Sequence, residues 1–289
     1  MRCLLALTGA LMLAWWMLAW GATGASADAT RLWPEPGHGS LAARVGYFQD
    51  DQTGAVQHTL VPSIHGHYSF SRRWSVSAEG GFVLLQASPD EGPGDSTVAV
   101  ASPTGIAFFE PFPRHRAHRL RFGLGGSLPL SLISRGAGGR LQRASINTAA
   151  GMDGLTRLEL WSPSRGSVLG LAQLRGPIDA GFRYAVQLKP TVLLPFVRRV
   201  SEDYAYFVLP WLAELSWGGD WGEAGVGGAL VLTPQSNVDS MQMSLSPFAR
   251  GRLDDAWLGL RLTAALDEPL AGDRGAGVWG LFLEAGGDL

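Results

Sequence analysis

The sequence predicts an all-β protein, a transmembrane antiparallel up-and-down β-barrel of about twelve strands. Three observations predict this fold class. Long segments alternate between apolar residues and polar or small ones, several are long enough to cross a bilayer as tilted strands, and turn-forming residues separate them regularly. Consecutive strands lie close together in the sequence, which favours a meander over β-α-β units.

The first 27 residues predict a cleaved signal peptide. Arg2 precedes an apolar run from Leu4 to Trp20, and Ala25-Ser26-Ala27 supplies the small residues that signal peptidase accepts. A membrane-anchoring helix is the alternative, because the run is nearly long enough to span a bilayer. Residues 28–289 are then one barrel domain. Cys3 is the only cysteine, so we expect no disulfide in the exported part.

The composition narrows the class of protein. Charged residues make up 17% of the chain, glycine is abundant with 39 residues, and Lys189 is the only lysine. A net charge of −2 provides no global field that would attract nucleic acid. Beyond residue 27 no apolar run is long enough to span a bilayer as a helix, so a membrane location requires a closed barrel.

The segment Arg119–Ile133, "RLRFGLGGSLPLSLI", has the longest alternation. Leucine and phenylalanine hold most even positions, whereas arginine, glycine and serine hold most odd ones. The alternation exceeds the roughly 9–11 residues that a tilted barrel strand needs. Its glycines do not form a dinucleotide-binding loop, because the third glycine and the following helix are missing.

The same pattern, strong or weak, recurs along the chain. The candidate strands are 41–48, 60–70, 73–86, 98–110, 119–133, 179–189, 191–197, 205–217, 223–232, 239–246, 256–266 and 278–285. Prolines lie within or beside them at positions 62, 103, 129, 190, 195, 210 and 247. Proline removes a ladder hydrogen bond, so either the strands are shifted by several residues or the barrel rims are bulged.

Residues 135–167 interrupt this rhythm. They contain no long alternation, and Leu141, Ala144, Ala149 and Met152 have loosely helical spacing. We expect a long surface loop here. A short amphipathic helix or plug, in the lumen or at the membrane interface, is the alternative.

The apolar faces of the strands favour lipid as their solvent. They are nearly pure Leu, Phe, Val, Met, Ala and Trp, whereas the opposite faces are rich in Gly, Ser and Ala, which suit a narrow lumen. Tryptophan and tyrosine gather near strand ends, as in the aromatic girdles of membrane barrels.

Units such as "HYSFSRRWSVSAEGGFVLL" and "WLGLRLTAAL", together with the leader, resemble bacterial outer-membrane β-barrel proteins. The likeness covers most of residues 40–286 and is one of pattern and composition. It implies the outer membrane of a Gram-negative cell, contact with its lipid and lipopolysaccharide, and insertion by the barrel-assembly machinery. The last strand departs from the pattern, because the chain ends at Leu289 rather than in an aromatic residue.

The predicted lumen face provides the candidate site. Its charged residues have both signs and are expected to form a constriction: Arg44, Glu79, Arg119, Arg121, Arg183, Glu214, Glu223, Arg261 and Glu284. His65 and His67 share a face and are weak candidates for binding a metal, although hydrated lumen polars are the more ordinary interpretation.

These residues predict a narrow passive channel or transporter for small solutes. A structural or surface-interaction barrel with a closed lumen is the alternative, because the mixed charges can pair with one another. A barrel lipid hydrolase is a third possibility, but no nucleophile motif supports it, so we expect neither enzymatic activity nor a cofactor.

Overall fold

The computed structural model describes residues 37–50, 55–89, 95–113, 118–130, 133, 137–179, 181–196, 205–234, 240–253, 256–266 and 279–288. The expected signal peptide, residues 1–27, lies outside the described residues.

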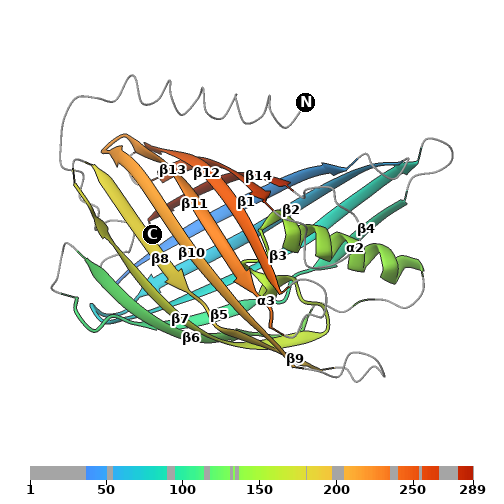
Figure 1. Cartoon of the computed structure of the whole chain (residues 1–289), viewed down its shortest axis with the longest axis horizontal. Coiled ribbons are helices and arrows are strands. Elements are labelled where there is room, and N and C mark those ends of the chain that lie inside the picture. Colours follow the sequence, from blue (N-terminus) through green and yellow to red (C-terminus); the bar gives the residue numbers. More distant parts are fainter. Residues whose placement is uncertain are drawn as a thin grey trace.

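Fourteen strands form one antiparallel sheet that closes on itself (Figure 1). They are β1 (His38–Asp50), β2 (Ala55–Ser69), β3 (Trp74–Pro89), β4 (Asp95–Val100), β5 (Thr104–Phe109), β6 (Arg119–Ser127), β7 (Arg165–Pro177), β8 (Phe182–Leu188), β9 (Thr191–Pro195), β10 (Tyr206–Gly219), β11 (Gly222–Leu232), β12 (Met241–Leu253), β13 (Ala256–Ala265) and β14 (Trp279–Asp288). The barrel closes where β1 pairs with β14, from Ser40 opposite Asp288 to Tyr47 opposite Leu281.

Two pairs of these strands, β4 with β5 and β8 with β9, each occupy one position in the wall, which we call a stave. The wall therefore has twelve staves. Both β4 and β5 pair with β3, and both β8 and β9 pair with β7 and β10. Pro190 divides β8 from β9 without changing their register. Pro103 lies where an extra residue enters between β4 and β5, since Phe82 faces Val100 but Glu79 faces Thr104.

The outer surface of the barrel carries large apolar side chains, as the alternation predicts. Leu124 on β6 is 69% exposed and Ile64 on β2 is 59% exposed, and comparable residues lie on most other strands. Exposed apolar surface on this scale is unfavourable in water but suits the hydrocarbon core of a bilayer. Among the described residues, neither helix has the length and apolarity that a membrane-spanning helix requires.

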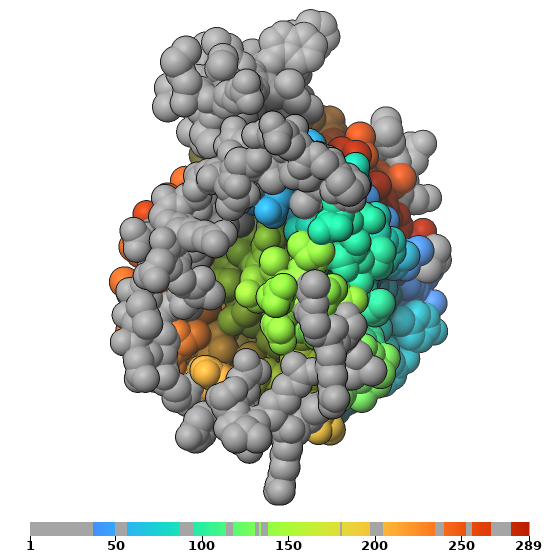
Figure 2. All heavy atoms as spheres, turned by 90° about the vertical axis from the view of Figure 1, so that its right-hand side faces the viewer, coloured from blue at the N-terminus to red at the C-terminus, as the bar shows by residue number. Residues whose placement is uncertain are grey.

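The interior contains the two described helices, α2 (Ala137–Met152) and α3 (Leu158–Trp161). Together with the turn at 153–157 we call them the plug. Seen from the end with the long connections, the plug occupies the middle of the barrel mouth (Figure 2). The expected surface loop at 135–167 is therefore wrong for the described residues, and the plug alternative is correct.

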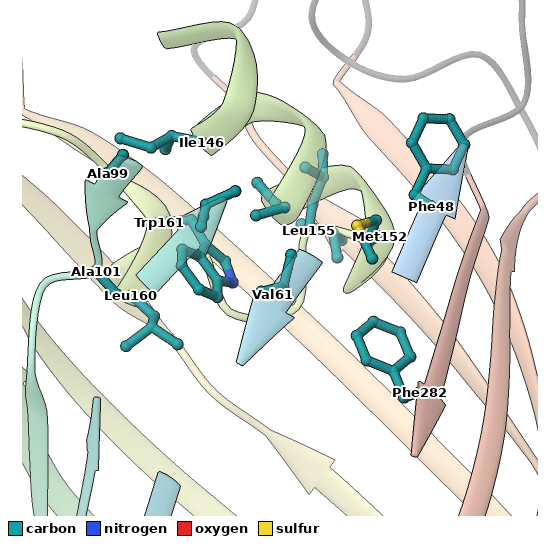
Figure 3. Close-up of a cluster of buried hydrophobic side chains, with 14 of the residues drawn as sticks. Phe48, Val61, Ala99, Ala101, Ile146, Met152, Leu155, Leu160, Trp161 and Phe282 are labelled. Carbon is teal, nitrogen blue, oxygen red and sulfur yellow. The ribbon is translucent and has the colours of Figure 1, made fainter. Parts of the chain in front are cut away.

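The plug packs on the wall through an apolar cluster. Ile146 and Met152 of α2 and Trp161 of α3 are almost fully buried, and they meet Val61 from β2 and Phe282 from β14 (Figure 3). Residues spaced three or four apart lie on one side of a helix. The side of α2 that carries Ile146 therefore packs against the wall. This half of the barrel interior thus contains a hydrophobic core between the plug and the wall.

The predicted number of strands is correct, but only because two errors in the prediction cancel. The prediction split the β8–β9 stave into 179–189 and 191–197, and it missed β7 altogether. The two errors compensate, so about twelve strands was correct. The missed strand has apolar residues on both faces, since Leu169 and Leu171 point inward and are buried while Val168 faces outward. Alternation therefore gives no signal there.

Candidate functional site in the barrel interior

The nine predicted lumen residues all lie on inward-facing positions of the wall, where burial alternates with the exposed apolar residues. They do not form a single ring. The structure brings most of them into one ion-pair network and places Arg119 and Arg121 on a separate part of the wall.

Glu284 on β14 is the centre of the network. Its carboxylate lies 3.4 Å from Arg44 Nε, 3.5 Å from Arg250 Nη2 and 3.6 Å from Arg261 Nε. The barrel register explains the contact with Arg44, because Arg44 on β1 is the direct partner of Glu284 across the closing pair of strands. Only 11% of the Glu284 side chain is exposed, so its charge depends on these three guanidinium groups.

The network extends to the neighbouring staves. Arg250 on β12 donates to Glu223, its direct partner on β11, at 2.9 Å, and Arg183 lies 4.0 Å from the same carboxylate. Arg261 on β13 also donates to Glu214 on β10 at 3.2 Å. Since two strands separate β13 from β10 in the sheet, this last contact runs along the inside of the wall rather than between adjacent strands.

The plug joins the network through its turn. Asp153 accepts a hydrogen bond from Arg44 Nη1 at 2.6 Å and another from Trp161 Nε1 at 2.8 Å. Arg157 forms ion pairs with Glu79 on β3 and, at 3.4 Å, with Asp153. Charges of the plug are thus neutralised by charges of the wall.

A second set of polar contacts connects the C-terminal end of the plug to the wall. Lys189, the only lysine, donates to Glu159 Oε1 and to the Thr156 carbonyl oxygen, each at 2.6 Å, and both charged side chains are almost fully buried. The Ser102 amide, at the bulge between β4 and β5, donates to the Leu160 carbonyl oxygen at 2.8 Å. The plug is therefore fastened by ion pairs and a backbone hydrogen bond as well as by apolar packing.

The other half of the lumen contains a cavity of about 440 Å³, which we call the vestibule. It lies at the end where β1 begins and β14 ends, since Ser40 and Asp288 line it. Its lining includes the arginines Arg121, Arg175, Arg183, Arg250 and Arg252. Glu284 and Arg44, which connect the wall to the plug, are not among its lining residues.

One wall of the vestibule is formed by β6 and β7. Arg119 is the direct partner of Arg175, and Arg121 is the direct partner of Gln173. Arg119 forms a bidentate pair with Glu110, at 2.8 and 2.6 Å. Arg121 Nε donates to Gln173 Oε1 at 2.7 Å, and its guanidinium lies 4.2 Å from the centre of the Phe108 ring.

His65 and His67 line the same vestibule. The His67 ring is 5.9 Å from the Phe108 ring, so it shares that ring with Arg121. Within the described ranges, no three His, Cys, Asp or Glu side chains gather as metal ligands would. The arginine-rich surroundings also disfavour a bound cation, so nothing in this geometry supports the suggested metal site.

Sequence reasoning did not include several charged residues of the interior. These are Glu110, Asp153, Arg157, Glu159, Arg175, Lys189 and Arg250. Arg175 belongs to the missed strand β7, and Arg250 lies beyond the predicted end of its strand at 246. Extending the alternation of "QMSLSPFARGR" past Pro247 would have found Arg250, because Gln242, Ser244, Ser246, Phe248 and Arg250 share one parity.

Comparisons with known proteins identify the fold. No family model matches the chain, and no curated protein sequence matches it. An outer-membrane channel from Pseudomonas putida F1 superimposes with a TM-score of 0.64 at 11% identity, covering 91% of this chain and 100% of that one. The NanC porin gives 0.53 at 9% identity, covering 86% and 100%. At such identities the likeness is one of fold, and the chain has the closed twelve-strand β-barrel fold of bacterial outer-membrane proteins.

Proposed function

We propose that this protein is a non-enzymatic outer-membrane channel that passes small solutes, and that the plug limits their size. The vestibule is the observation that carries the proposal. A charged cavity does not stabilise a purely structural barrel, since burying charge costs free energy unless the charge is solvated or paired. A cavity of about 440 Å³ that is lined by both signs of charge suits a hydrated solute path.

The chain also supports an orientation. Connections at the vestibule end are short, such as 178–181, 220–221 and 254–255, whereas 128–164 and 266–278 lie at the other end. Outer-membrane barrels have short periplasmic turns and long extracellular loops. The vestibule therefore opens to the periplasm, and the plug faces the cell exterior.

A closed structural barrel is the second candidate, favoured by the apolar cluster between plug and wall. A lipid hydrolase has weaker support. His67 Nε2 is 3.5 Å from Ser69 Oγ, a distance beyond the roughly 2.6–3.2 Å of an activated serine and its base. Ser127 Oγ instead bonds to Ser167 Oγ at 2.9 Å.

Planar-bilayer recording of the purified full chain tests the channel. We expect small, discrete current steps, because the plug leaves only a narrow path, and no steps from the same sample after heat unfolding. Absence of current at every voltage, from protein shown to be folded by heat-modifiable migration in detergent gels, would exclude the channel and favour the closed barrel.

A further inference from the structure

The turn between β2 and β3 presents two arginines at the vestibule end of the barrel. Arg72 and Arg73 are exposed, and among the described residues no carboxylate forms an ion pair with either. Ser71 Oγ accepts hydrogen bonds from the amides of Arg73 and Trp74, at 3.2 and 3.0 Å. The Glu110 amide donates to the Arg73 carbonyl oxygen at 2.8 Å, which connects the turn to the end of β5. These hydrogen bonds fix the backbone that carries the two exposed guanidinium groups.

Aromatic rings lie on the outer face of the barrel beside this turn. Trp74 is 48% exposed, and its ring centre is 4.9 Å from that of Phe109, its direct partner on β5. Tyr68 on β2 and Phe70, which follows that strand, are also exposed. Tryptophan and tyrosine rings prefer the depth of the lipid headgroups, and arginine side chains beside them reach the lipid phosphates. This outer surface therefore has the composition of a boundary between hydrocarbon and headgroups.

Charge is distributed unevenly around the rim at this end of the barrel. Two connections become neighbours because β3 pairs with β5, and in the sequence they carry four arginines: Arg72, Arg73, Arg114 and Arg116. The one carboxylate in these connections, Glu110, forms the bidentate pair with Arg119. The remaining connections at this end and the end of β14 carry aspartates instead: Asp179, Asp220, Asp254, Asp255 and Asp288. An anionic headgroup is therefore attracted to the side of β2, β3 and β5.

We propose that the outer surface formed by Arg72, Arg73, Trp74 and Phe109 binds the headgroup of an anionic phospholipid, with the two arginines contacting its phosphate. A guanidinium group binds phosphate through two parallel hydrogen bonds. The adjacent rings lie on the lipid-facing side of the wall, so the surface fits a lipid rather than a free phosphate ion. The orientation inferred for the proposed channel places this lipid in the periplasmic leaflet, but the site itself does not depend on conduction.

Native mass spectrometry of the folded full chain in a neutral detergent tests the site. The probes are phosphatidylglycerol and phosphatidylcholine with the same acyl chains. We expect phosphatidylglycerol to be retained at about tenfold lower lipid concentration, because the cation of the choline headgroup offsets the attraction to arginine. Equal retention of the two lipids would overturn the proposal. Displacement of phosphatidylglycerol by an equal concentration of soluble glycerol 3-phosphate would also overturn it, because the site would then bind phosphate ions rather than lipid.

Matched variants assign the binding to these side chains. R72Q/R73Q should weaken retention of phosphatidylglycerol by at least about tenfold and leave that of phosphatidylcholine unchanged. R72K/R73K should keep most of the binding, since both positive charges remain. The control R140Q/R143Q removes the same charge from exposed positions of α2 in the plug and should bind like the wild type. Undiminished binding by R72Q/R73Q, or an equal loss in the control, would contradict the assignment.

The lipid site and the channel fail in different ways. Folded protein that prefers phosphatidylglycerol but never conducts would remove the channel function and keep the site. Protein that conducts but retains both lipids equally would remove the site and keep the channel.

Discussion

At the scale of single residues, Glu284 shows how the barrel interior stays folded around its charges. It pairs with Arg44, Arg250 and Arg261, which lie on three different strands. Removing one partner of a buried ion pair leaves the remaining charges uncompensated, and this costs more than the pair contributes when intact. The free-energy cost of losing Glu284 is larger than for a single pair, because its one carboxylate neutralises three guanidinium groups.

We predict that E284Q destabilises the barrel by about 3 kcal/mol. Glutamine keeps the size of the side chain, so the loss reports on charge. The measurement is the temperature at which the fast-migrating folded band disappears from detergent gels, which should fall clearly. The matched variant E214Q removes a carboxylate that is 30% exposed and pairs with Arg261. It should cost only about 1 kcal/mol, and equal losses in the two variants would contradict this account.

Small residues of the interior make room for neighbouring side chains. A Cβ atom at Gly123 would lie 2.9 Å from Ile106 and 3.1 Å from Phe108, and one at Gly125 would meet the backbone of Gly105. The glycines of "RLRFGLGGS" therefore allow close approach of β5, including the ring that orients Arg121. Sequence alternation placed them on the correct face but could not tell an open lumen from a packed one.

The alternation of residues along each strand was sufficient to place all nine predicted residues on the interior face. It could not reveal their partners, because these depend on register, on barrel closure and on the plug. Arg157 and Asp153 lie in a segment without strand periodicity, so no alternation could have linked them to Glu79 and Arg44. That the nine residues select solutes stays a prediction.

At the scale of elements, the plug fills one half of the lumen and leaves the vestibule in the other. Its apolar side chains fill one half of the barrel, and its charges bind the wall at Arg44, Glu79 and Lys189. The sequence predicted the wall better than the plug, because strand alternation persists over many residues whereas α2 offers only a short amphipathic pattern. Nothing in a helical pattern says whether its apolar face meets lipid or the inside of a barrel.

We predict that G280A displaces the plug and increases conductance. A Cβ atom at Gly280 would lie 2.9 Å from the Met152 carbonyl oxygen, so the end of α2 must move. Planar-bilayer recording should show larger or more frequent current steps than the wild type. The control G80A places its Cβ in open space on β3, outside the lining of the vestibule, and should leave the currents unchanged. Unchanged currents in G280A would show that the plug does not limit conduction.

At the scale of the whole molecule, one half of the barrel interior is the polar vestibule, the other holds an apolar cluster with buried ion pairs between plug and wall, and the outside is apolar. Composition and periodicity predicted the outer face, because a lipid-facing surface requires a long and uninterrupted apolar series. The division of the interior into a core and a vestibule could not be predicted, since it depends on where residues 137–161 fold back into the lumen.

The most direct test of the account compares the solvent on the two faces of the wall. Spin labels are attached at L124C, on the outer face, and at A185C, in the vestibule, in a Cys3→Ser background reconstituted in liposomes. Collision rates with oxygen, which partitions into lipid, and with a water-soluble nickel chelate are then measured. We predict that the label at 124 collides mainly with oxygen and the label at 185 mainly with the chelate. Chelate-dominated collisions at position 124 would contradict the membrane barrel itself.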